Sequence, residues 1–163
     1  MINLLHCKQQ GPHGGQGGNE FAISADGRIT ALNIRCGGWI DAVQLLFQKQ
    51  DGTEDSTEKA GGNGGGLKLF RLSEGERITK VYGGASQFVD LIVIETDKGR
   101  KETFGNNSSP VNFTYIVEEG HQLVGFFGRA ATYVDALGIF TIPEPTLSGN
   151  DKDASFNFLE GLA

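Results

Sequence analysis

The chain has 163 residues, of which 38% are hydrophobic and 25 are glycine, and its formal net charge is −6. This length fits one domain that buries about two thirds of its unfolded surface. The many glycines favour short strands and tight turns over long helices, and the negative charge argues against nucleic acid or an anionic membrane as the main partner.

The first residues and the cysteines exclude several further classes. The opening MINLLHCKQQ has no basic segment and only a short apolar run, so it does not resemble a signal peptide. No stretch has the apolar length of a membrane span. We therefore expect a cytoplasmic protein, with unconventional release left open. Cys7 and Cys36 lack the spacing of metal ligands, so we expect no metal or cofactor and favour two thiols over one bridge.

Alternating apolar and polar residues, rich in β-branched and aromatic side chains, predict an all-β domain. No window of useful length sustains a helical period. We expect an extension or strand over residues 1–10, a folded domain over 11–145 and a tail over 146–163 that is either partly ordered or a docking segment. The predicted strands, in chain order, are Leu4–Lys8, Phe21–Ile23, Ile29–Arg35, Ile40–Phe47, Lys68–Leu72, Ile78–Tyr82, Val89–Glu95, Asn112–Val117, Gln122–Phe127 and Tyr133–Thr141.

One short motif occurs three times: an aromatic residue, a β-branched residue, an aspartate, and a small or aliphatic residue. The copies are Trp39-Ile40-Asp41-Ala42, Phe88-Val89-Asp90-Leu91 and Tyr133-Val134-Asp135-Ala136. Their aspartates are about 49 and about 45 residues apart, a period typical of repeated structural units. Glycine clusters at 14–18 and 61–66, with a weaker version at 105–109, repeat out of phase with the motif. The chain therefore reads as three related units, each with a glycine-rich loop and an aspartate at a strand start.

This combination suits a small polyhydroxylated ligand. Glycine lets a loop approach a ligand closely and present its N–H groups, and one carboxylate accepts hydrogen bonds from two vicinal hydroxyls. A phosphate loop is disfavoured, because Lys68 is misplaced and no helix follows the second glycine cluster. In the plain structural alternative, Asp41, Asp90 and Asp135 only satisfy turn amides.

The order of these motifs resembles that of jacalin-related lectins. The resemblance rests on GPHGGQGG from Gly11, GGWIDAV from Gly37, the glycine cluster 61–66, and the LVGFFGR and YVDALG segments that follow, and it extends to Ile142. It implies a β-prism I fold, with three four-stranded antiparallel sheets around a pseudo-threefold axis. It also implies a non-enzymatic, carbohydrate-binding function. Because the loop at Gly11 is internal to the chain, the resemblance is to the mannose/glucose-binding branch.

The resemblance also implies where sugar binds. A first site would use the amides of Thr132 and Tyr133, the Asp135 carboxylate and the first glycine loop; its residues are Gly14, Gly15, Ala131, Thr132, Tyr133 and Asp135. Ala131 departs from the family, which has glycine there. A second site would keep the motif intact, with residues Gly37, Gly38, Trp39, Ile40, Asp41, Gly61 and Gly62. The third copy has Ser86 at the motif glycine, so we expect Asp90 to be inactive. The segment Thr96–Lys101 would form a neighbouring loop that tunes specificity.

The sequence leaves two alternative functions. Catalysis is disfavoured, because Glu118 and Glu119 would face opposite sides of a strand and no His, Cys or Ser lies in a nucleophile context. A structural or targeting β-prism with degenerate sites, acting through protein–protein contacts, is favoured by Ala131 and the tail and disfavoured by the intact motif ending at Asp41. For a lectin we expect affinity of about 1 mM for a monosaccharide (about −4 kcal/mol), so two sites or a homo-oligomer would supply avidity.

Overall fold

The computed structural model describes residues 7–144. These residues form strands joined by turns and loops, and they contain no helix. The all-β prediction is confirmed. Because these residues contain no helix, none of them forms a helix that could cross a membrane. The predicted tail over 146–163 and most of the predicted segment Leu4–Lys8 lie outside the described residues.

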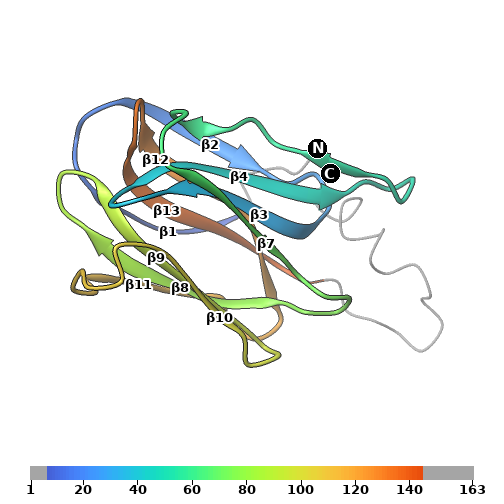
Figure 1. Ribbon diagram of the computed structural model, residues 1–163. Coiled ribbons are helices and arrows are strands. Elements are labelled where there is room, and N and C mark those ends of the chain that lie inside the picture. The colour runs from blue at the N-terminus through green and yellow to red at the C-terminus, as the bar shows by residue number, and fades with distance from the viewer. Residues whose placement is uncertain (1–6, 145–163) are drawn as a thin grey trace.

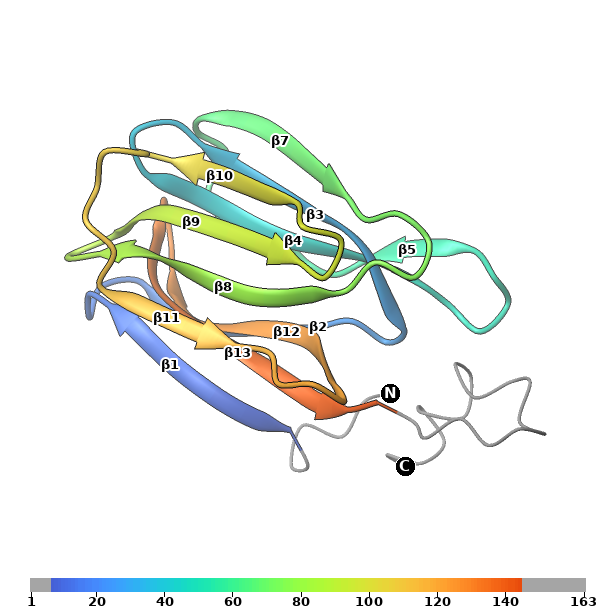
Figure 2. The ribbon, with the colours of Figure 1, turned by 90° about the horizontal axis from the view of Figure 1, so that it is seen from below.

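Three antiparallel sheets form the domain (Figures 1 and 2). In the first sheet the strands run in the order β1 (Lys8–Gly14), β13 (Val134–Pro143), β12 (His121–Ala130) and β2 (Asn19–Ser24). In the second sheet the order is β5 (Glu54–Ser56), β4 (Ile40–Gln48), β3 (Arg28–Cys36) and β7 (Gly66–Arg71), and β6 (Ala60–Gly61) also pairs with β4. In the third sheet the order is β10 (Lys101–Gly105), β9 (Val89–Thr96), β8 (Ile78–Ala85) and β11 (Phe113–Ile116).

Each sheet has the same plan, which confirms the predicted threefold repeat. A hairpin of two long strands lies in the middle (β3–β4, β8–β9 or β12–β13), and shorter strands flank it. In the second sheet, β5 and β6 together take the place of one flanking strand of β4. The first sheet begins at Lys8, so it includes three residues of the segment predicted as an extension.

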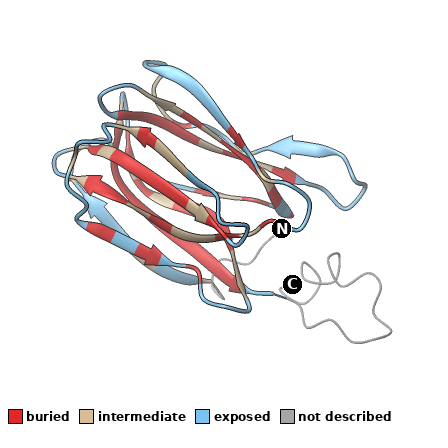
Figure 3. Ribbon diagram, turned by 60° about the horizontal axis from the view of Figure 1, so that its bottom comes forward, coloured by how far each residue is buried: buried red, intermediate tan, exposed pale blue. Residues whose placement is uncertain are grey.

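The three sheets enclose a large apolar core, because alternate residues of the central strands point inward. Val124, Phe140 and Ile142 of the first sheet form a second, smaller apolar cluster. Figure 3 shows that buried residues concentrate on these central strands, whereas the flanking strands are largely exposed and contribute fewer buried residues. Burial of each large apolar side chain stabilises the fold by about 1.5–3 kcal/mol. The largest fully buried side chains include Leu32, Ile34, Leu45, Ile92, Ile94, Phe104, Tyr115, Phe126, Leu137 and Ile139. Cys7 and Cys36 are not bridged to each other.

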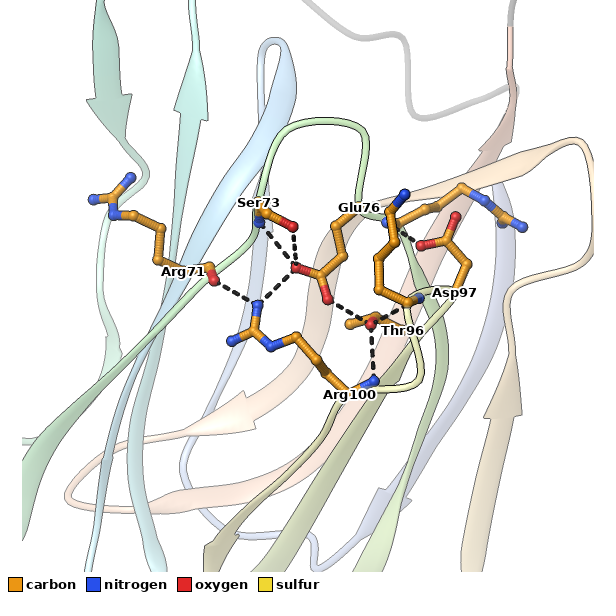
Figure 4. Close-up of polar contacts among 8 residues, drawn as sticks. Arg71, Ser73, Glu76, Thr96, Asp97 and Arg100 are labelled. Carbon is orange, nitrogen blue, oxygen red and sulfur yellow. Dashed lines mark hydrogen bonds and ion pairs between the residues drawn. The ribbon is translucent and has the colours of Figure 1, made fainter.

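A buried carboxylate holds together the connections at the end of the third sheet where β8 begins and β9 ends (Figure 4). Oε1 of Glu76 accepts hydrogen bonds from the Ser73 amide (2.9 Å), the Ser73 hydroxyl (3.0 Å) and Nη1 of Arg100 (2.7 Å). Its Oε2 accepts one from the Thr96 hydroxyl (2.6 Å). Arg100 also donates to the backbone carbonyl of Arg71 (2.9 Å). This network joins the β7–β8 connection to the β9–β10 turn.

The position of Thr96 in β9 corrects the expectation that Thr96–Lys101 forms a loop beside the sugar sites. Thr96 is the last residue of β9, whereas Asp90 is its second residue. At about 3.3 Å per residue, the two lie about 20 Å apart. The segment Thr96–Lys101 therefore lies at the opposite end of the sheet from the aspartate motifs, and its predicted role as a specificity loop is wrong.

Candidate functional site

The three aspartate motifs form three equivalent hairpin loops. Asp41, Asp90 and Asp135 are each the second residue of their strand, β4, β9 and β13. A register shift precedes each loop, between Arg35 and Cys36 in the second sheet and at the matching places in the others. Such a bulge turns the strand and re-aims the residues that follow. The amide two residues before each aromatic position then closes the loop by donating to its carbonyl, as Gly37 does to Trp39 (3.0 Å).

The aromatic residues of the three motifs bring these loops together. The ring centroids of Trp39 and Tyr133 and those of Phe88 and Tyr133 are both 5.1 Å apart, and those of Trp39 and Phe88 are 5.7 Å apart. Such aromatic pairs contribute about 0.5–1.5 kcal/mol each beyond the area that they bury. The three aspartates therefore gather at one end of the molecule, around a shared aromatic cluster.

Each aspartate is paired with one glycine loop. The Gly15 amide donates to the carbonyl of Asp135 (2.8 Å), and the Gly62 amide donates to the carbonyl of Asp41 (2.8 Å). In the third unit the Asn106 amide makes the same bond to Asp90 (2.7 Å). The structure thus brings Gly14 and Gly15 together with the Asp135 motif, and Gly61 and Gly62 together with the Asp41 motif, as the two predicted sites require.

The glycine loops pass directly over the carboxylates. A Cβ atom on Gly65 would lie 2.5 Å from Oδ1 of Asp41, and one on Gly64 would lie 2.6 Å from Oδ2. Gly18 has the same relation to Oδ1 of Asp135 (2.6 Å). Gly18 and Gly65 also have φ angles of 69° and 65°, which side chains disfavour. Glycine is therefore required at Gly18 and Gly65 by two independent constraints, the lack of space for a Cβ atom and the positive φ.

Two arginines, which sequence reasoning missed, hold these loops in place. Nε and Nη2 of Arg35 donate to the carbonyls of Gly64 (2.9 Å) and Gly65 (3.0 Å). Arg129 makes the same pair of bonds to Gly17 and Gly18, both at 2.9 Å. The sequence does carry a signal for this role. Each arginine is the sixth residue before its aspartate, and the third unit has Gly84 at that position.

The third unit closes its own carboxylate. Ser109 takes the position that Gly18 and Gly65 have in the other loops, and its hydroxyl donates to Oδ1 of Asp90 (2.8 Å). No arginine holds this loop, because Gly84 replaces it. The inactivity of Asp90 stays a prediction, and the hydrogen bond from Ser109 favours it.

Ala131, where the family pattern has glycine, fits the first loop. Its amide donates to the carbonyl of Tyr133 (2.9 Å), the same bond that Gly37 makes in the second unit. No residue other than glycine has a positive φ among those described, so Ala131 does not strain the backbone. The alanine therefore leaves the loop closed in the same way as in the intact copy.

The carboxylates of Asp41 and Asp135 are both buried, and one oxygen of Asp135 lacks a hydrogen-bond partner among the described residues. Asp41 and Asp135 are 6% and 4% exposed. Burial raises the pKa of both carboxyls above their usual range, although the charges of Arg35 and Arg129 oppose the rise. Within residues 7–144, Oδ1 of Asp135 is buried and accepts no hydrogen bond. Because an unsatisfied buried acceptor costs about 1–3 kcal/mol, this oxygen favours a hydrogen-bond donor from outside the chain.

The site has no metal-binding character. Among the described residues, no group of three or more His, Cys, Asp or Glu side chains is arranged to hold an ion. The arrangement consists of one carboxylate and several backbone amides, which can recognise hydroxyl groups without titrating them.

Comparisons with known proteins show the family and the fold of the chain. Residues 10–140 match the jacalin-like lectin domain. Horcolin from Hordeum vulgare is 30% identical over 140 residues, which cover 82% of this chain and 95% of horcolin. The structure of wild-type Malaysian banana lectin is similar with a TM-score of 0.73 and 27% identity, covering 84% of this chain and 99% of the lectin. The structure of a mannose-binding jacalin-related lectin from Ananas comosus has a TM-score of 0.70 and 26% identity, covering 85% of this chain and 99% of that lectin.

Proposed function

Because the chain belongs to the jacalin-like lectin domain family, we propose that it is a non-enzymatic lectin for mannose- or glucose-type glycans, with two sites per chain. The observation that carries the proposal is the buried Asp135 Oδ1, which accepts no hydrogen bond from the described residues. A sugar hydroxyl supplies the missing donor. The intact loop around Asp41 supports a second site of the same kind.

The geometry suits vicinal hydroxyls. The ionised carboxylate accepts hydrogen bonds from two neighbouring hydroxyls, while the exposed amides of the motif loop donate to sugar oxygens. In the first site these amides belong to Thr132 and Tyr133, and in the second to Gly38 and Trp39. The arginine behind each glycine loop fixes it before the ligand arrives, which lowers the entropy cost of binding.

The preference for mannose or glucose is supported by two points. The glycine loop that follows Gly11 is internal to the chain, as in the mannose/glucose-binding branch. The pineapple lectin, of similar structure, is described as mannose binding. A glycan array tests the preference. We expect glycans that end in mannose or glucose to bind, and an array on which only galactose-terminated glycans bind would overturn it.

The structural alternative loses one of its two supports. It relied on Ala131 as a sign of a degenerate site and on the tail over 146–163; Ala131 makes the same loop-closing bond as Gly37, and the tail lies outside the described residues. The weak affinity expected of each site favours multivalent display. Assembly into a homo-oligomer, like a cytoplasmic location, remains a prediction from the sequence.

Sugar binding is expected to weaken on acidification at a higher pH than for an ordinary aspartate. Sugar hydroxyls donate to the ionised carboxylate, so affinity is full above the pKa of Asp41 and Asp135 and falls as the pH drops through it. Since burial raises both pKa values, the loss begins above the usual value of about 3.9. Titration with methyl α-mannoside from pH 7 to pH 4, with circular dichroism to follow folding, measures the effect. Constant affinity over this range would contradict it.

A further inference from the structure

The glycine loop of the second site lies against the motif loop of the first. A methyl group on Gly62 would overlap the carbonyl oxygen of Thr132, and it would lie only 3.0 Å from the carbonyl carbon. Real Cβ atoms do not come this close to backbone oxygen, so Gly62 packs against this carbonyl with no free space between them. Gly62 itself has no positive φ, so its contact with Thr132, and not its backbone angle, excludes a side chain.

This contact acts on a group that the proposed function uses. The carbonyl of Thr132 and the amide of Tyr133 belong to one rigid peptide plane. Any displacement of the Thr132 oxygen therefore rotates or shifts the Tyr133 N–H, one of the two amides proposed to donate to sugar in the first site. The Gly62 amide also donates to the backbone carbonyl of Asp41 (2.8 Å), so one residue links the backbone of the second motif to the first binding loop.

A second contact of the same kind links the first site's glycine loop to the third unit, which is not a proposed binding site. Gly15 of the first site's loop lies against the Gln87 carbonyl in the same way. However, Gln87 belongs to the third unit, whose Asp90 is already bonded to Ser109. The glycine loop of the second site therefore contacts a proposed binding loop, whereas that of the first site contacts a unit whose carboxylate is closed.

From this geometry we infer that Gly62 is a positioning residue for the first site, and that the two sites are energetically coupled through the peptide between Thr132 and Tyr133. The inference rests on the proposed lectin function. By linkage, a ligand that orders the loop around Gly62 changes the affinity of the first site, and the reverse also holds.

The test uses the full chain carrying Asp41→Asn, so that only the first site binds. Gly62→Ala is compared with Gly66→Ala in this parent. Gly66 is a matched control, because it has no positive φ and a Cβ atom there meets nothing within 4 Å. Nitrogen–proton NMR spectra follow the Tyr133 amide, titration with methyl α-mannoside gives the affinity, and thermal unfolding confirms the fold.

We expect Gly62→Ala to move the Tyr133 amide resonance and to weaken sugar binding about tenfold, which is about 1.4 kcal/mol, while Gly66→Ala changes neither. An unmoved Tyr133 resonance, or an equal loss of affinity in both variants, would overturn the inference. A parent that binds no sugar would instead refute the first site, and the Tyr133 resonance would separate that failure from a failure of the coupling.

A second measurement covers the case in which Gly62→Ala does not fold. In the Asp135→Asn chain only the second site is expected to bind. Adding methyl α-mannoside to this protein should then move the Tyr133 amide resonance, although Tyr133 belongs to the other site. A Tyr133 resonance that stays in place while the second site fills would overturn the coupling.

Discussion

Replacing Asp41 and Asp135 together by asparagine is expected to abolish sugar binding and to leave the fold intact. Asparagine puts an NH₂ donor where the carboxylate presents an acceptor, and each charge-assisted bond lost is worth about 1.5–3 kcal/mol. Against a monosaccharide binding energy of about −4 kcal/mol, this loss removes measurable binding. The glycan array and calorimetric titration with methyl α-mannoside are the measurements.

The same substitutions should not lower stability. Burial raises the pKa of both carboxyls, which means that the fold disfavours their charged forms at neutral pH. An uncharged asparagine avoids this penalty, so the unfolding temperature of the double variant should equal or exceed that of the unchanged protein. Each single variant should bind with half the stoichiometry.

Asp90→Asn is the matched control for this experiment. Its carboxylate already accepts a bond from the Ser109 hydroxyl, so binding should persist after its replacement. Binding that survives in a folded Asp41→Asn/Asp135→Asn protein would refute the site assignment. Loss of binding in Asp90→Asn would show that the third unit takes part in recognition after all.

The sequence predicts best those strands whose side chains alternate. Ile29–Arg35 and Ile40–Phe47 were predicted because apolar residues recur at every second position, and they form most of β3 and β4. The β10 strand was missed because Phe104 is its only large apolar residue. Pairing with β9, and not its own pattern, makes this segment a strand. The short strands β5 and β6 were also missed, because neither has an alternating apolar pattern and both form by pairing with β4.

The repeated aspartates and glycines of the candidate site could be predicted from the sequence, but the arginines that hold the glycine loops could not. Repetition of the aspartates and glycines indicated which loops meet, because each unit repeats the same spacing. Arg35 and Arg129 act on backbone carbonyls of loops that are distant in sequence, and such contacts leave no local pattern. The only sequence signal for this role is that each arginine is the sixth residue before its aspartate, Asp41 or Asp135. The effect of Ala131 on its loop could not be predicted from the sequence either, because it depends on the backbone φ angle at that position.

The other large expected effect concerns stability. Glu76→Gln should destabilise the protein by about 2–4 kcal/mol at neutral pH, because it removes a buried charge on which several donors converge. The ion pair with Arg100 loses its negative partner, while the connections that Glu76 joins keep their buried polar groups. For a domain of this size, the unfolding temperature should fall by about 5–15 °C. Glu74→Gln, a change of an exposed neighbour, is the control and should have little effect.

The pH dependence of the difference in unfolding free energy between the unchanged protein and Glu76→Gln shows whether the charge of Glu76 causes it. Hydrogen bonds from Thr96, Ser73 and Arg100 lower the pKa of Glu76 from 4.5 to about 2, even though burial opposes them. A carboxyl whose pKa is lower in the folded state stabilises the fold above pH 4.5, and this contribution is lost as the pH falls towards 2. The free energies of unfolding of the unchanged protein and Glu76→Gln should therefore differ most near pH 7 and converge on acidification. A difference that stays constant from pH 7 to pH 3 would mean that Glu76 contributes through packing, and that its charge is not what holds the two connections together.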